Sequence, residues 1–396
     1  MKTVYVDNAA STAMTDAAIK AMLPYLKEVY ANPSSLHTIG QKSKEAIEEA
    51  RAKIAKVLNC EPREIYFTSG GSEADNQALR SAAYNGLKKG KKHIITTAFE
   101  HHAVINPLKK LEKEGFDVTY LPVSKDGFVT AKQVEEAIRP DTALVSVMYI
   151  NNEIGTIQPV KEIGAVCKKA GVPFHTDAVQ AVGHIPVDVN ADNIDMLAIS
   201  AHKFHGPKGI GALYCRKTVP LMSFVEGGAQ ERGRRAGTEN TAGIVGMAVA
   251  LEEACTDMQK KDKKIKAMRD RLIEGLLKIP HSRLNGSVKN RLCSNVNMCF
   301  EGIEGEGLLL LLDARGICAS SGSACTSGSL DPSHVLLSIG LPHEIAHGSI
   351  RISLSEYNTE EDVDAILKAV PEVVQYLRNM SPVWEDLEKG KKPHLI

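Results

Sequence analysis

The chain has 396 residues, 43% apolar and 24% charged, which is ordinary for a globular protein of one or two domains. The 48 basic residues balance the 48 acidic ones, so charge gives no reason to expect a nucleic acid partner. Residues 1–5 hold no apolar targeting segment, the leucine run 308–312 is too short to cross a bilayer, and the eight cysteines contain no C-x-x-C pair. We therefore expect no membrane partner and a reducing, cytoplasmic location.

Apolar periodicity predicts an alternation of helices and strands. Helical spacing covers 17–29 and 42–58, and short apolar runs predict strands at 65–68, 93–97, 118–121, 143–147, 172–175, 196–199 and 211–215. This alternation predicts an α/β fold with a mostly parallel seven-stranded sheet and helices on both faces. A polar helical stretch over 241–277 is expected to lead into a smaller α+β domain with a strand at 295–300 and a helix at 359–377.

Two predicted strand ends carry side chains suited to an aldehyde cofactor. Lys203 follows the strand at 196–199, where partial burial would lower its pKa toward the neutral amine that forms a Schiff base. Asp177 follows the strand before it, and ligands of such sheets bind at the carboxyl ends of strands. An aspartate for a pyridine nitrogen and a lysine for an aldehyde are what pyridoxal phosphate (PLP) enzymes need. A solvated lysine and a helix N-cap aspartate are the alternatives.

A glycine turn between a strand and a helix is a candidate phosphate cradle. In residues 64–76, Gly70 and Gly71 let the backbone approach an anion, and amide groups at a helix N-terminus attract one. Ser72 with Asp75 three residues later fits a capping box. An ordinary strand-to-helix turn is the alternative, since the chain has neither a G-x-G-x-x-G nor a Walker motif.

On these residues the chain resembles the cysteine desulfurases, the NifS/IscS-like branch of the PLP-dependent fold-type I (class-V aminotransferase) family. The resemblance runs from Val6 to about Asp364. Besides the strands that end near Asp177 and Lys203, the matching segments are 6–12, 32–37, 100–104, 151–155, 235–240, 321–325 and 349–353. It implies a large PLP-binding domain of residues 15–257 and a small domain of residues 1–14 with 258–396. It also implies a homodimer that converts L-cysteine to L-alanine and passes the sulfur to an acceptor or iron–sulfur scaffold protein.

The resemblance also implies the role of each site residue. Lys203 would bind the cofactor aldehyde and move the substrate proton, His101 would stack on the ring, and Arg351 would clamp the substrate carboxylate with its two-pronged donor. The implied cofactor contacts comprise ring and phosphate partners, with one from the other subunit: Gly71, Ser72, His101, Asn152, Asp177, Gln180, Ser200, His202, Lys203 and Thr238. Asn152 would also assist in binding the substrate.

Cys325 is the implied sulfur acceptor within the enzyme. It lies in residues 319–329, almost all small and without apolar periodicity, which predicts a mobile loop. Such a tether suits a nucleophile that attacks sulfur and then hands it on, and the thiolate is the reactive form. A cysteine without a function is the alternative. Four others fit small buried hydrophobes in helices or strands: Cys60, Cys167, Cys215 and Cys255.

Three further segments leave alternatives open. The segment 343–347 matches the zinc pattern H-E-x-x-H, but the helix available is barely over one turn, so we expect a link before the Arg351 strand and no metal. The cluster Arg232, Arg234 and Arg235 is either a solvated face or part of a dimer interface. The charged stretch 385–392 is either a solvated end or a docking surface for the sulfur acceptor. A selenocysteine lyase, an aminotransferase and a metallopeptidase remain the competing functions.

Overall fold

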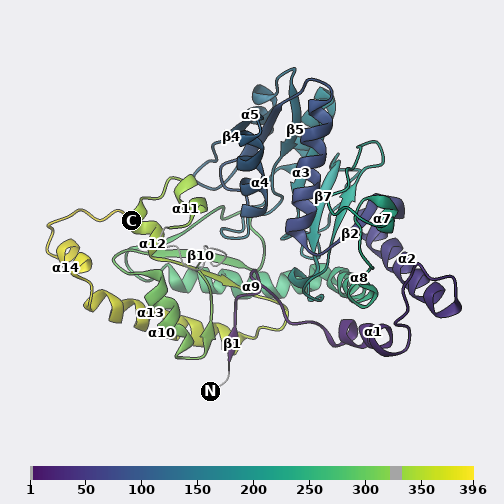
Figure 1. Ribbon diagram of the computed structural model, residues 1–396. Coiled ribbons are helices and arrows are strands. Elements are labelled where there is room, and N and C mark those ends of the chain that lie inside the picture. The colour runs from purple at the N-terminus through teal and green to yellow at the C-terminus, as the bar shows by residue number, and fades with distance from the viewer. Residues whose placement is uncertain (1–2, 322–331) are drawn as a thin grey trace.

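A seven-stranded sheet forms the larger part of the computed structural model, which describes residues 3–321 and 332–396 (Figure 1). Within those residues its order is β2-β8-β7-β6-β5-β3-β4. The strands are β2 (Ile65–Thr68), β3 (His93–Thr97), β4 (Asp117–Leu121), β5 (Thr142–Ser146), β6 (Phe174–Asp177), β7 (Met196–Ser200) and β8 (Gly211–Cys215). Only the pairs that β8 makes with β2 and β7 are antiparallel, so the predicted mostly parallel sheet is confirmed.

Helices cover both faces of this sheet. Met196 and Ala198 of β7 pack on the side of α3 and α4, while Leu197 and Ile199 pack on the side of α2 and α8. Successive strand residues point to opposite faces, so an apolar strand buried on both faces has few polar positions except at its ends. The helices are α1 (Asp16–Lys27), α2 (Thr38–Leu58), α3 (Gly71–Leu87), α4 (His102–Lys113), α5 (Ala131–Ala137), α6 (Val160–Ala170), α7 (Gln230–Gly233) and α8 (Thr241–Cys255).

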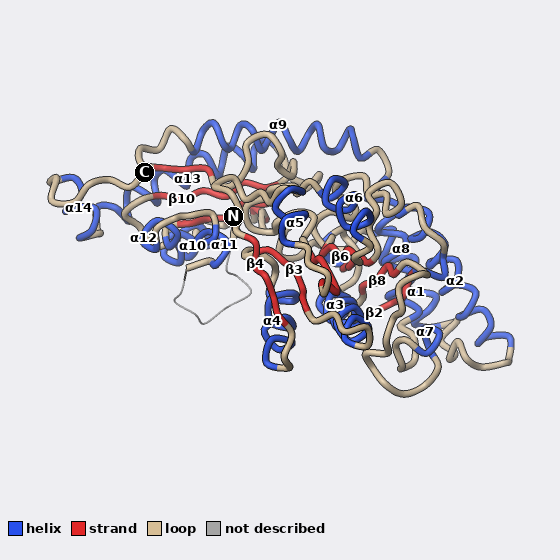
Figure 2. Tube along the Cα trace, turned by 90° about the horizontal axis from the view of Figure 1, so that it is seen from above, coloured by secondary structure: helices blue, strands red, loops and turns tan. Residues whose placement is uncertain are grey.

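A smaller α+β body follows. Its antiparallel sheet has the order β12-β10-β9, and β1 (Val4–Tyr5) pairs with β11 (Ile317–Cys318), so the N-terminal residues join the C-terminal part. The remaining elements are β9 (Ser282–Leu284), β10 (Asn295–Phe300), β12 (Ser349–Ser353), α9 (Met258–Leu276), α10 (Gly305–Asp313), α11 (His334–Ser338), α12 (His343–His347), α13 (Glu360–Asn379) and α14 (Pro382–Glu388). Figure 2 shows α9 alongside α13. The division at residues 14/15 and 257/258 stays a prediction.

The expectation of one helix over 241–277 is wrong. The chain breaks between α8 and α9, where Thr256 is extended and Asp257 has a left-handed φ of +54°. Thr256 Oγ1 donates to the Glu252 carbonyl at 2.8 Å, and side chains of this kind compete with the backbone for the hydrogen bonds of a helix. Across residues 3–321 and 332–396, no helix is both long and apolar enough to span a membrane.

Candidate active site

Asp177 and Lys203 lie at the ends of two adjacent parallel strands. Asp177 is the last residue of β6 and pairs in register with Ala198 of β7. Lys203 ends the short 3-10 helix η2 (Ala201–Lys203), which begins directly after β7. Parallel strands end at the same edge of a sheet, which is where ligands of such sheets bind. The two residues singled out in the sequence thus share that edge.

The N-terminal segment lies on these strand ends. Lys203 Nζ donates to the carbonyl oxygens of Ala9 at 2.7 Å and Ala10 at 2.9 Å. Gln180 Nε2 donates to the same Ala9 oxygen at 2.9 Å. Two residues predicted from separate segments, Lys203 for the aldehyde and Gln180 for the ring, are therefore linked through one stretch that sequence reasoning did not assign to the site.

Burial controls the charges around Asp177. Burial raises the pKa of the Asp177 carboxyl, while His101 and Lys203 oppose this shift, and its Oδ1 accepts the Val179 amide at 3.0 Å. Burial also raises the pKa of the neighbouring Glu100 to about 8. A positive group brought against Asp177 would offset the cost of burying its negative charge. The carboxylate is thus suited to a protonated ring nitrogen.

His101 has a defined orientation at the start of α4. Its Nδ1 accepts the backbone amide of Ala103 at 3.1 Å, as an N-cap. An acceptor nitrogen carries no proton, so this contact places the proton of the neutral ring on Nε2. His334 Nε2 lies 2.9 Å from the Glu100 carbonyl, which ties α11 to the same turn. His101 is therefore fixed as a potential proton donor through Nε2.

The glycine turn begins α3 with a residue that has no side chain. Gly71 is the first residue of α3, and a Cβ added there would lie 2.5 Å from Val179 Cγ2 and 3.6 Å from Ser200 Cβ. The bare helix N-terminus beside the Ser200 side chain suits a phosphate group. The expected capping box is wrong, because Gly70 is the N-cap and Ser72 is already helical. Asp75 is instead buried, with Oδ1 3.3 Å from His175 Nε2.

The two remaining phosphate candidates differ in position. His202 Nδ1 lies 3.3 Å from Ser11 Oγ, and burial with the charge of Lys203 lowers its pKa to about 4, so the ring is neutral at pH 7. Thr238 lies on an exposed stretch before α8 and lines a small cavity with Ser69 and Gly209. Its exposure is compatible with the predicted contact to a second subunit, which stays a prediction.

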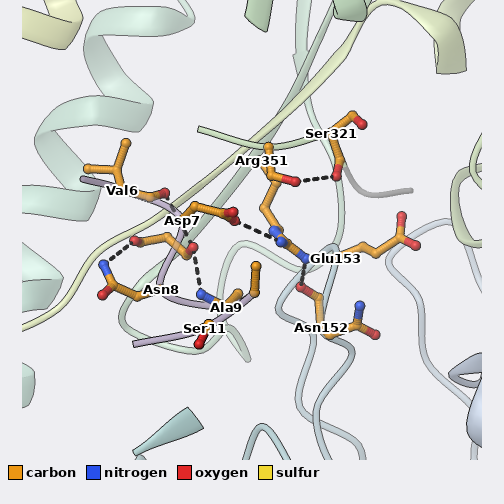
Figure 3. Close-up of polar contacts among 12 residues, drawn as sticks. Val6, Asp7, Asn8, Ala9, Ser11, Asn152, Glu153, Ser321 and Arg351 are labelled. Carbon is orange, nitrogen blue, oxygen red and sulfur yellow. Dashed lines mark hydrogen bonds and ion pairs between the residues drawn. The ribbon is translucent and has the colours of Figure 1, made fainter. Parts of the chain in front are cut away.

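Arg351 is buried on β12 with only 3% of its surface exposed. Its Nη2 lies 3.0 Å from Asp7 Oδ1 and its Nη1 donates to the Asn152 carbonyl at 3.1 Å, as Figure 3 shows. Within the described part of the chain, Nε has no hydrogen-bond partner. Burial raises the pKa of Asp7, whereas the positive charges of Arg351 and Lys203 both lower it. The charges of both residues therefore act on the Asp7 carboxylate. Asn152 contributes its main-chain oxygen here, and Asp7 was missed from the sequence.

Cys325 lies outside the described residues, but the segments on either side contact the site. Before it, Ser320 exchanges two backbone hydrogen bonds with Arg351. After it, Ser333 donates to the buried Glu153 carboxylate, and His334 contacts Glu100. The seven described cysteines are free thiols: Cys60, Cys167, Cys215, Cys255, Cys293, Cys299 and Cys318.

The H-E-x-x-H segment forms only the five-residue helix α12, directly before β12. Its two histidine rings lie 4.8 Å apart between centroids. This agrees with the prediction of a short link before the Arg351 strand. Such a helix is far shorter than the scaffold of a zinc peptidase, in which a longer helix holds both ligands.

Comparison with known proteins places this geometry in a family. Residues 4–366 match the family model for aminotransferase class-V. The chain is 57% identical to cysteine desulfurase IscS of Methanosarcina thermophila, over 96% of this chain and 94% of that protein. It is 54% identical to cysteine desulfurase IscS of Clostridium botulinum strain Hall, over 99% of both chains.

Solved structures of similar proteins support the same family. A NifS-like protein superposes with a TM-score of 0.89 at 40% identity, covering 95% of this chain and all of that one. SspA in complex with cysteine superposes with a TM-score of 0.80, also at 40% identity, covering 90% of this chain and all of that one. The chain belongs to the class-V aminotransferase family and, within it, to the PLP-dependent cysteine desulfurases.

Proposed function

We propose that this protein removes sulfur from L-cysteine, giving L-alanine and a persulfide on Cys325. The observation that carries the proposal is the shared N-terminal stretch: Asp7 contacts Arg351, and Ala9 contacts Lys203 two residues later. An arginine suited to a carboxylate and a lysine suited to an aldehyde thus contact the same three-residue stretch, which supports a single site for both. The complex of SspA with cysteine supports the same class of substrate.

The residues fit PLP on its charge and shape. Gly71, Ser72, Ser200 and His202 would hold the phosphate, and Gly71 begins the helix with a residue that has no side chain of its own. Asp177 would pair with the ring nitrogen, assisted by contacts from Gln180, His101 and Asn152. Bound PLP supplies an electron sink for the charge left when the substrate Cα proton is removed.

Each protein group then has a separate task. Arg351 would bind the substrate carboxylate, and Lys203 would hold the cofactor aldehyde and serve as the base for the Cα proton. The Cys325 thiolate attacks the substrate sulfur, so that an S–S bond forms while the C–S bond breaks. The electron pair of the broken bond stays with the carbon skeleton, which takes up one proton at Cβ and regains one at Cα to become alanine. His101 is oriented to exchange protons through Nε2.

The proposal includes a homodimer and a protein acceptor for the sulfur. Large apolar side chains are exposed on α1 and the stretch after it: Leu23, Leu26, Tyr30 and Leu36. Such a patch indicates an interface, and Thr238 on its exposed stretch would then reach the second subunit's phosphate. Sedimentation of Leu26→Glu tests this: a stable monomer with unchanged activity would contradict the need for a dimer.

The nucleophile is tested with Cys325→Ser and the matched control Cys318→Ser. Cys325→Ser should keep the cofactor absorbance and its shift on adding L-cysteine, but should form no persulfide and no alanine in repeated turnovers. Cys318→Ser alters a free thiol on β11, seven residues earlier, and should keep normal turnover. Alanine formation at the normal rate by Cys325→Ser would refute the assignment.

A further inference from the structure

Two histidines and a glutamate converge on the small body, away from the site above. His281 precedes β9, Glu301 follows β10, and His394 lies beyond α14, where Figure 1 shows the last segment returning toward α12. One ligand atom from each lies within 4.8 Å of the other two. The Nδ1 atoms of His394 and His281 are 2.8 Å and 3.5 Å from the same Glu301 oxygen, Oε2. These three residues are called the His–Glu–His cluster below.

The cluster has the donors and spacing of a metal site. Two imidazoles and one carboxylate form a common zinc ligand set, in which bonds of about 2.0–2.1 Å at tetrahedral angles put the donor atoms roughly 3.3 Å apart. The observed 2.8 Å and 3.5 Å lie on either side of that value. The rings are stacked with centroids 3.6 Å apart, and because χ2 of histidine is a soft torsion, rotation can bring both Nδ1 lone pairs onto one ion. Both side chains are 32% exposed, which leaves a path from solvent.

The backbone beneath the cluster is held in place. His281 has a left-handed φ of +52°, which is unfavourable for a residue with a side chain. Arg378, 3% exposed, donates to the His281 carbonyl through Nη2 and to the Glu301 carbonyl through Nε, each at 3.0 Å. The Glu301 amide also donates to the His281 carbonyl at 3.0 Å. One buried arginine therefore fixes two of the three candidate ligands relative to each other.

We propose that the His–Glu–His cluster binds a divalent transition-metal ion of the Zn²⁺ class. Glu301 is only 4% exposed in its side chain and uses its other oxygen to accept the Leu395 amide at 2.7 Å. The Ile396 oxygen accepts from His281 Nδ1 at 2.8 Å, and the Ile396 side chain packs against a buried apolar cluster that includes Ile345. A bound metal ion would replace the Nδ1 proton that His394 shares with Oε2 and the Nδ1 proton that His281 donates to Ile396, and it would attach the segment after α14 to the small body through His394.

The fluorescence of Trp384, the only tryptophan of the chain, can report metal binding at the cluster. Trp384 lies 5.5 Å from the His281 ring and 5.6 Å from the His394 ring, between centroids. We expect Ni²⁺, whose paramagnetic ion quenches a nearby indole, to reduce its fluorescence saturably at one ion per chain. Zn²⁺ should compete and restore the fluorescence. The titration uses the PLP-loaded protein in a Cys325→Ser background, so that this thiol does not compete for metal and the cofactor's own quenching is common to all samples.

Two variants of the cluster and one control variant test whether the quenching comes from metal bound at the His–Glu–His cluster. His394→Ala truncates an exposed ligand, and Glu301→Gln keeps the shape of the buried one; each should weaken Ni²⁺ binding at least tenfold. The double variant His343→Ala/His347→Ala removes another pair of neighbouring histidines on the same body and should leave the quenching unchanged. Absence of saturable quenching, quenching that survives His394→Ala, or loss of quenching in the double variant would each overturn the proposal.

Discussion

Replacement of Arg351 by lysine tests how the substrate carboxylate is bound. Lysine keeps the positive charge opposite Asp7 but has one ammonium group in place of the planar fork. In the structure Nη2 contacts Asp7, Nη1 contacts the Asn152 carbonyl, and Nε has no partner among the described residues. A lysine can serve either Asp7 or the substrate, and it cannot give two parallel hydrogen bonds to a carboxylate.

The magnitude follows from one lost charge-assisted hydrogen bond. Such a bond contributes about 1.5–3 kcal/mol, and about 1.4 kcal/mol corresponds to a factor of ten. We therefore expect Arg351→Lys to lower kcat/KM for L-cysteine by about 10- to 150-fold. The change should appear mainly in KM, because the carboxylate is bound in both the ground state and the transition state while the bonds to sulfur change.

The assay is steady-state alanine formation over a range of L-cysteine concentrations, with cofactor absorbance as a check on loading. Arg269→Lys is the matched control, because Arg269 is also a buried arginine of the small body, 5% exposed, and donates to the Arg291 and Leu292 carbonyls. An unchanged KM for Arg351→Lys, or an equal rise for Arg269→Lys, would refute the assigned role.

Three further predictions concern the cofactor and the pH dependence of stability. Gly71→Ala should weaken PLP retention in a titration of the apoprotein, because the new Cβ would lie 2.5 Å from Val179 Cγ2. Lys203→Ala should lose the absorbance near the visible edge while circular dichroism stays unchanged. Against the opposing effect of burial, the His205–Glu356 pair raises the pKa of His205 and lowers the pKa of Glu356 to about 2. Its stabilisation should be fullest between about pH 4.5 and pH 6.5, decreasing as the pH rises through the folded pKa of His205 or falls toward 2; a melting temperature with the same pH profile in Glu356→Gln would contradict this.

The strands were predictable because burial on both faces makes them short apolar runs between polar turns. The run at 196–199 became β7, one residue longer, and the run at 172–175 became β6, shifted by two residues. Strand direction was not predictable in the same way, since nothing in the composition of β8 marks it as the antiparallel strand. The break at Thr256 and Asp257 was missed because apolar spacing continues across it, and only two residues leave the helical conformation.

The site was predictable where chemistry is carried by side chains at strand ends. Lys203 and Asp177 are unusual there, because Asp177 ends and Lys203 closely follows a strand whose residues are all buried. The Ala9 and Ala10 carbonyls were not predictable, since a main-chain oxygen leaves no mark in the sequence and Lys203 is more than 190 residues away. The capping box was predicted wrongly because the spacing between Ser72 and Asp75 fits that motif. In the fold, the Asp75 side chain is instead buried against His175.

The N-terminal segment connects the large sheet to the small one at the site. Ala9 donates its amide to Ser353 Oγ at 2.9 Å and accepts Lys203 Nζ at its carbonyl, while Asn8 Nδ2 donates to the Ser353 carbonyl at 2.9 Å. Ser353 ends β12, the strand that carries Arg351. A single residue thus bonds to the lysine end of the large sheet and to the arginine strand of the small one. Because hydrogen bonds to both bodies fix Ala9, the separation between the amine and the guanidinium is set by this segment as well as by packing between the two bodies.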